Sequence, residues 1–98
     1  MIIRGRELPE STKGRKLYPL TSHEIAGRHF ATWVTQPGNP FGPHKHEQQE
    51  LWFIIDGQAI ATLGDQQRVV ESGDLIEIAP WVEHGLRTDT EVRWICMG

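Results

Sequence analysis

The sequence predicts an all-β domain, a sandwich or barrel built from many short antiparallel strands. Apolar segments rich in β-branched and aromatic residues recur at a spacing of roughly 8 to 12 residues, separated by Gly, Pro, Asp and Ser. No window combines a 3.6-residue apolar period with helix-capping residues. Because the chain has 98 residues, we expect a single domain with one hydrophobic core.

The first 24 residues are expected to form an N-terminal arm or edge strands of the same domain, with the barrel over residues 25–98. Ile2-Ile3 and Leu17–Leu20 predict two short strands. Pro9, Pro19 and several charges favour the edge of a sheet over its centre. An arm that pairs with a partner subunit is the alternative for this part of the chain.

The strands expected after this arm follow one another closely. Turn residues separate them, among them Gly57, Gly64-Asp65 and Ser72-Gly73-Asp74, which favour hairpins. The predicted ranges are 28–36, 51–56, 58–63, 67–71, 75–78, 84–88 and 91–97.

The stretch Gly38–Gly57 carries the strongest chemical signal in the chain. His44 and His46 lie two residues apart, so on a β-strand both imidazoles would face the same side. Glu50, on a neighbouring strand, offers a carboxylate to the same point. Imidazole and carboxylate together suit a first-row divalent metal better than Mg²⁺ or Ca²⁺, which prefer oxygen ligands. The stretch therefore predicts most of a transition-metal site.

A helical zinc-protease motif is a competing interpretation, because the segment His46–Glu50 resembles HExxH with Glu as its last ligand. That motif requires a helix, so that positions i and i+4 share a face. The segment Pro37–Pro43 is crowded with Pro and Gly, and Leu51–Ile55 has the aromatic and β-branched content of a strand. Both flanks favour the strand interpretation.

Together with a later histidine, these residues resemble the cupins, a family of small jelly-roll β-barrels. The first cupin motif runs G-x5-H-x-H-x3-E-x6-G. Every fixed position and every gap of that motif is present in this sequence, at Gly38, His44, His46, Glu50 and Gly57.

The second cupin motif, G-x5-P-x-G-x2-H-x3-N, is matched in part. Gly73 and His84 fall at the required positions. Ala79, Trp81 and Thr88 replace the Pro, Gly and Asn of the motif. The spacing that delivers the histidine is intact, whereas Trp81 lacks the backbone freedom of Gly, which leaves the geometry of this turn open.

The resemblance implies a single-domain cupin jelly roll with one divalent transition metal held by His44, His46, Glu50 and His84. In this family such sites carry Fe, Mn, Ni, Cu, Co or Zn. Three neutral imidazoles and one carboxylate give a divalent ion a net charge of +1, and an octahedral ion would keep two open positions.

Family precedent further implies a metal-dependent enzyme, a dioxygenase, decarboxylase or isomerase, with oxygenase-type or related chemistry favoured here. The substrate would be a small organic molecule chelated at the metal, with Glu50 as the catalytic base. The alternatives are a non-catalytic domain that binds or senses a metal or small ligand, and a metal-free structural barrel.

Strand parity assigns expectations to the remaining candidate residues. Trp52 shares parity with Glu50 and should face the barrel interior, as core or as a wall of the substrate pocket. Trp81 precedes His84 in a loop, where it would cover the pocket or form a surface contact. The other expectations are a core position for Trp33 and Trp94, a buried hydrophobic role for Cys96, no metal ligation by His23 and His29, and outward orientations for Lys45 and Arg87.

Composition limits the partners and the location. A formal net charge of −3 and a pI near 5.9 argue against nucleic-acid binding, and no apolar run is long enough for a membrane span. The N-terminus lacks a secretory-signal pattern, and a single cysteine fits a reducing, cytoplasmic compartment. Leu51, Phe53 and Ile55 should point outward, which predicts a homodimer.

Overall fold

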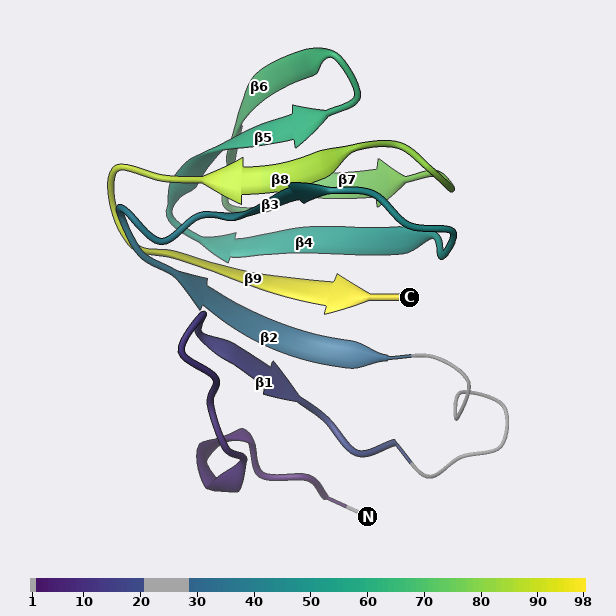
Figure 1. Cartoon of the computed structure of the whole chain (residues 1–98). Coiled ribbons are helices and arrows are strands. Elements are labelled where there is room, and N and C mark those ends of the chain that lie inside the picture. Colours follow the sequence, from purple (N-terminus) through teal and green to yellow (C-terminus); the bar gives the residue numbers. More distant parts are fainter. Residues whose placement is uncertain (1, 21–28) are drawn as a thin grey trace.

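The computed structural model describes residues 2–20 and 29–98, and this part of the chain forms two antiparallel β-sheets (Figure 1). This arrangement confirms the all-β prediction. The described elements are the 3-10 helix η1 (Gly5–Glu7) and the strands β1 (Arg15–Leu17), β2 (Phe30–Thr35), β3 (Phe41–His44), β4 (Glu50–Asp56), β5 (Gln58–Leu63), β6 (Gln66–Glu71), β7 (Leu75–Ile78), β8 (His84–Arg87) and β9 (Val92–Met97).

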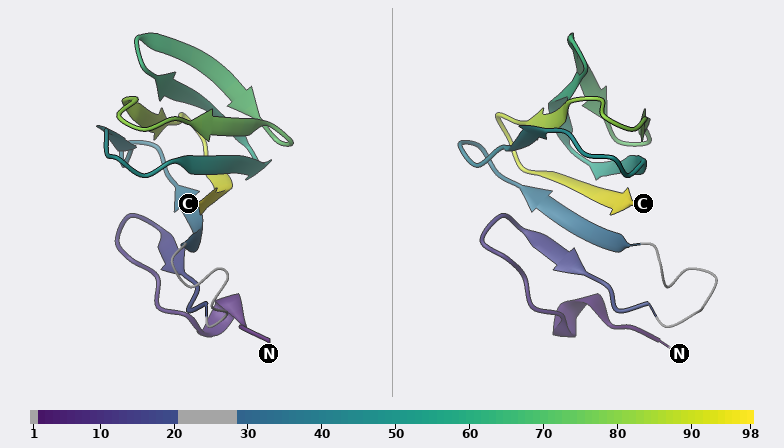
Figure 2. Two further views of the ribbon diagram at one scale, coloured as in Figure 1. Left: turned by 90° about the vertical axis from the view of Figure 1, so that its right-hand side faces the viewer. Right: turned by 45° about the vertical axis from the view of Figure 1, so that its right-hand side comes forward.

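The chain passes from one sheet to the other at several connections, and one of these lies between β3 and β4. The five-stranded sheet has the order β1-β2-β9-β4-β7, and the four-stranded sheet has the order β3-β8-β5-β6. Two further views show β1 and β2 extending beyond the region where the sheets face each other (Figure 2). The crossover at residues 45–49 therefore carries the chain from His44 in one sheet to Glu50 in the other.

The core lies between the sheets and is dominated by tryptophan. Along β4, Glu50, Trp52 and Ile54 are buried, and the residues between them are exposed, as period-two alternation requires. Trp94 stacks on Trp33 at a centroid distance of 5.2 Å and contacts Trp52 at 4.6 Å. The expected core positions of Trp33 and Trp94 are confirmed. Each buried aromatic ring adds roughly 4–6 kcal/mol of transfer free energy, since it removes 150–250 Å² from water.

The N-terminal segment differs in part from the prediction. The strand expected at Ile2-Ile3 is wrong, because these residues are irregular and lead into η1. The strand expected over Leu17–Leu20 is shifted toward the N-terminus and forms β1, which pairs with β2 and occupies the edge of its sheet. Pro19 lacks a backbone N–H and so cannot extend the ladder on the donor side.

The remaining strand boundaries lie close to those expected from the sequence. β5 and β7 begin and end at the predicted residues, and β2, β4, β6, β8 and β9 differ by one or two positions within the described residues. No strand was predicted over residues 41–43 of β3, because residues 38–43 were expected to form a loop. Gly57 forms the tight turn between β4 and β5 with φ of 96°, and a Cβ there would lie 2.5 Å from the carbonyl oxygen of Glu91. Within residues 2–20 and 29–98, no helix has the length and apolar content needed to cross a membrane.

Candidate metal centre

Three imidazoles converge between the two sheets. His44 is the last residue of β3 and pairs directly with His84, the first residue of β8, while His46 lies just after β3. One ring nitrogen of each of the three lies within 4.8 Å of those of the other two. The prediction that His44 and His46 share a strand is wrong, since β3 ends at His44. The loop holds His46 in place instead, because its carbonyl oxygen accepts a 2.8 Å hydrogen bond from the backbone N–H of Trp81.

Glu50 completes the cluster from the opposite side. It is the first residue of β4 and therefore comes from the facing sheet. Its Oε2 lies 3.3 Å from Nε2 of His46, and its Oε1 lies 3.7 Å from Nε2 of His84. The carboxylate is only 9% exposed, and Oε1 also accepts a 3.1 Å hydrogen bond from the indole N–H of Trp52. The carboxylate thus lies beside two of the three clustered histidines, His46 and His84.

The fully buried ring of His84 is fixed in one tautomer. Its Nδ1 lies 2.8 Å from the carbonyl oxygen of Val82, which can only accept, so Nδ1 carries the proton. In the neutral ring Nε2 is then the atom with the lone pair, and it has no hydrogen-bond partner among the described residues. A backbone carbonyl that orients a ring nitrogen in this way is the usual support of a metal-bound histidine.

The surroundings of His44 favour its neutral imidazole, the form that binds metals. Burial is the main cause that lowers the pKa of His44, and the neighbouring His84 and His46 lower it further. The carboxylate of Glu50 acts in the opposite direction. A nitrogen lone pair at His44 is therefore available at neutral pH.

Comparison with known proteins identifies the family. The family model described as the cupin domain matches residues 31–98. The chain belongs to the cupin family.

Solved cupin structures share the fold at low sequence identity. An RmlC-like cupin from Shewanella frigidimarina superposes with a TM-score of 0.81 at 20% identity, over 97% of this chain and 86% of that one. A predicted oxalate decarboxylase from Thermotoga maritima superposes with a TM-score of 0.77 at 22% identity, over 99% of this chain and 96% of that one. A cupin-2 domain protein from Rhodospirillum rubrum superposes with a TM-score of 0.73 at 22% identity over 85% of this chain. The matched part covers only 56% of that protein.

The two tryptophans expected near the pocket occupy contrasting positions in this cupin. Trp52 is fully buried beside His84, with ring centroids 5.5 Å apart. Trp81 is 63% exposed and has φ of 64°, the left-handed conformation that glycine would adopt more easily. The turn before His84 therefore retains a positive φ despite the change from the Gly of the family motif.

A second cluster adjoins the first and was not expected from the sequence. His29, assigned as a non-ligand, lies with its Nε2 3.6 Å from Oε2 of Glu50 and 3.2 Å from Sγ of Cys96. Cys96 is buried as expected, and burial, with the nearby Glu50, raises the pKa of its thiol to about 12. His29 shares strand parity with the inward-facing Ala31 and Trp33, a signal that could have indicated its direction. His23 lies outside the described residues.

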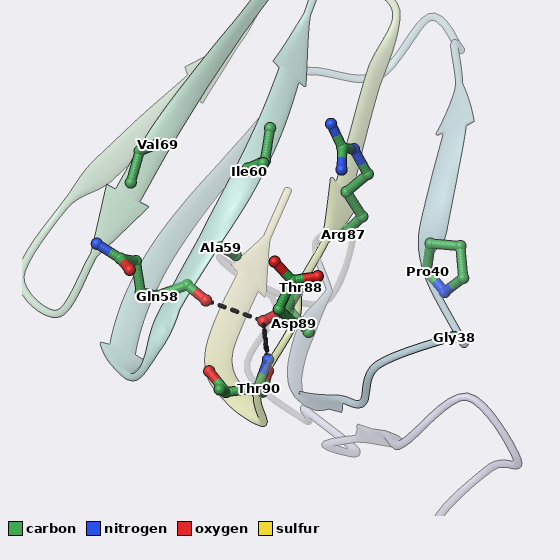
Figure 3. A pocket seen from close by; sticks show the side chains of 10 residues that line it. All are labelled: Gly38, Pro40, Gln58, Ala59, Ile60, Val69, Arg87, Thr88, Asp89 and Thr90. Carbon is green, nitrogen blue, oxygen red and sulfur yellow. Dashed lines mark hydrogen bonds between the residues drawn. The ribbon is translucent and has the colours of Figure 1, made fainter.

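The surroundings of the two clusters include a groove of about 850 Å³. We call it the Glu50 groove; its wall includes His29, Phe30, Glu50, Leu51, Glu77 and Met97. A second groove of about 520 Å³ lies on the four-stranded sheet and contains none of the four clustered residues (Figure 3). There Thr88, at the Asn position of the family motif, donates to the carbonyl oxygen of Gln58 and accepts from the N–H of Thr90. As expected, Arg87 and Lys45 are exposed.

Proposed function

We propose that this cupin binds one divalent transition metal through His44, His46, Glu50 and His84. The observation that carries the proposal is Nε2 of His84, which is buried and finds no hydrogen-bond partner within residues 2–20 and 29–98. Leaving such a polar atom unsatisfied costs free energy, and an ion at this point would satisfy it. The donor set of three nitrogens and one oxygen is compatible with Fe, Mn, Ni, Cu, Co and Zn.

The chain's own residues would prepare the site for that ion. Val82 fixes the tautomer of His84, and Trp52 holds one oxygen of Glu50. Both interactions reduce the reorganisation that binding would require. The carboxylate also supplies a negative charge in a nearly dry environment, where it offsets the charge of a cation more effectively than in water.

We further propose that the site serves a metal-dependent enzyme of the oxygenase type, or related chemistry, that acts on a small organic molecule. A bound transition metal would supply Lewis acidity or dioxygen binding. The role of Glu50 would be to hold a substrate proton or the metal, and the Glu50 groove would give a substrate access to that carboxylate. The similarity to a predicted oxalate decarboxylase supports this class of substrate, small oxygen-bearing molecules. A single cysteine also supports a cytoplasmic location.

Elemental analysis of protein purified without chelators or affinity-tag metals tests the metal proposal. We expect bound transition metal in the wild type, a loss in His46→Ala, and no change in Lys45→Ala, a matched control at the adjacent exposed position. No metal in the wild type, even after reconstitution with each candidate ion, would refute the proposal. Metal without turnover or oxygen consumption would favour the alternative function, non-catalytic binding or sensing.

A further inference from the structure

The cluster of His29, Glu50 and Cys96 has the composition of a metal site of its own. One donor atom of each residue lies within 4.8 Å of those of the other two. Sulfur, imidazole nitrogen and carboxylate oxygen are the three ligand types that zinc sites use. The cluster is separate from the three histidines described above, and Glu50 is the residue that adjoins both groups.

Two of the three distances within this cluster are close to those expected around one tetrahedral ion, and the third, from Cys96 to Glu50, is no longer than 4.8 Å. Bond lengths typical of zinc place sulfur and nitrogen ligands about 3.6 Å apart, and nitrogen and oxygen ligands about 3.4 Å apart. The corresponding distances are 3.2 Å between Cys96 Sγ and His29 Nε2, and 3.6 Å between His29 Nε2 and Glu50 Oε2. Small side-chain rotations would therefore suffice for coordination.

Glu50 lies against both groups. Its Oε1 lies 3.7 Å from Nε2 of His84, and its Oε2 lies between a histidine of each group, 3.3 Å from Nε2 of His46 and 3.6 Å from Nε2 of His29. A carboxylate placed in this way can bridge two cations, an arrangement found in two-metal sites. Access is also available, because His29 and Glu50 both line the Glu50 groove and the His29 side chain is 31% exposed.

We propose that His29, Cys96 and Glu50 bind a second divalent ion of the zinc and cobalt class, with water from the groove as the fourth ligand. The site itself does not require the first metal, but the bridging role of Glu50 rests on the function proposed above. On binding, the Cys96 S–H bond breaks heterolytically. The electron pair stays on sulfur and forms the metal–sulfur bond, and the proton passes to solvent, with no change in oxidation state.

Titration of the metal-free protein with Co²⁺ tests this proposal, because thiolate coordination gives a charge-transfer band that His and Glu ligands do not. We expect two equivalents bound and a thiolate–cobalt band in the wild type. Cys96→Ser should lose the band and one equivalent while retaining the other. His29→Gln keeps the thiol but removes a direct ligand. It should lower the affinity for the Co²⁺ ion that gives the thiolate band by at least tenfold.

The variant His46→Ala separates this proposal from the first. It should no longer bind the Co²⁺ ion that gives no thiolate band, and it should still bind the ion that gives the band. Absence of the band in the wild type, or an identical titration of the wild type and Cys96→Ser, would overturn the second site. A single equivalent that carries the band and is unaffected by His46→Ala would support the second site and refute the first.

Discussion

Replacement of Trp52 by Phe tests how the protein prepares Glu50, and Trp94→Phe provides a matched control. Both indoles are fully buried, and both donate their N–H to a side-chain oxygen. For Trp52 the acceptor is the carboxylate of Glu50 at 3.1 Å, whereas for Trp94 it is the hydroxyl of Thr35 at 2.9 Å. The two substitutions therefore remove the same atoms from the core but leave different acceptors unpaired.

The difference between these variants can be estimated from the acceptors. A hydrogen bond to a neutral group contributes about 0.5–1.5 kcal/mol, and one to a charged group about 1.5–3 kcal/mol. Replacing indole by phenyl removes a similar amount of core packing in the two variants. We therefore expect Trp52→Phe to lower the free energy of unfolding of the metal-free protein by about 1 kcal/mol more than Trp94→Phe. Metal affinity should fall by about 10- to 100-fold in Trp52→Phe and stay unchanged in Trp94→Phe.

Urea unfolding of the metal-free variants gives the first quantity, and competition against a chelating dye gives the second. A Trp52→Phe protein that binds metal as tightly as the wild type would refute the reasoning. So would equal losses of affinity in both variants, because the effect would then come from core packing and not from the bond to Glu50.

Three further predictions concern backbone strain, pH and assembly. Trp81→Gly should raise the free energy of unfolding by roughly 0.5–1 kcal/mol in urea unfolding, because Gly adopts the positive φ without strain; a decrease would contradict this. The folded state lowers the pKa of His44 below its ordinary value of 6.5, so the unfolded chain binds the proton more readily. The contribution of His44 to the free energy of unfolding should therefore be constant above about pH 6.5 and decrease as the pH falls below that value. Urea unfolding at a series of pH values measures this contribution. Leu51, Phe53 and Ile55 are exposed on one face of the five-stranded sheet, as predicted, together with Leu75 and Met97. We expect this apolar face to meet its two-fold copy in a dimer by light scattering and Phe53→Asp to give monomers; a monomeric wild type at micromolar concentration would contradict the prediction.

The sequence allowed the composition of the first cluster to be predicted because its spacing is local. Residues 44, 46 and 50 lie within one short segment, so few arrangements of the chain can separate them. His84 followed from the spacing of the second motif, which its altered turn residues did not disturb. Along β4, alternation alone placed Trp52 inward and Phe53 outward, since the side-chain period of a strand does not depend on its neighbours.

What could not be predicted depends on contacts between distant segments. The sequence does not say that β3 and β4 belong to different sheets, so the approach of Glu50 from the facing sheet could not be predicted. His29 and Cys96 are 67 positions apart and meet only because β2 pairs with β9. Strand parity could have indicated the inward direction of each residue, but their proximity required the register between the two strands.

The position of the first cluster across the crossover also affects the stability of the fold. His44 and His84 belong to the four-stranded sheet and Glu50 to the five-stranded sheet, so an ion held by all of them would act as a cross-link between the two layers. Because that site is assembled only when both sheets are folded, metal binding would add to the free energy of unfolding by mass action. At a free metal concentration one hundred times the Kd, the gain would be about 2.7 kcal/mol. The melting temperature of this small barrel would then depend on the metal supply of its surroundings.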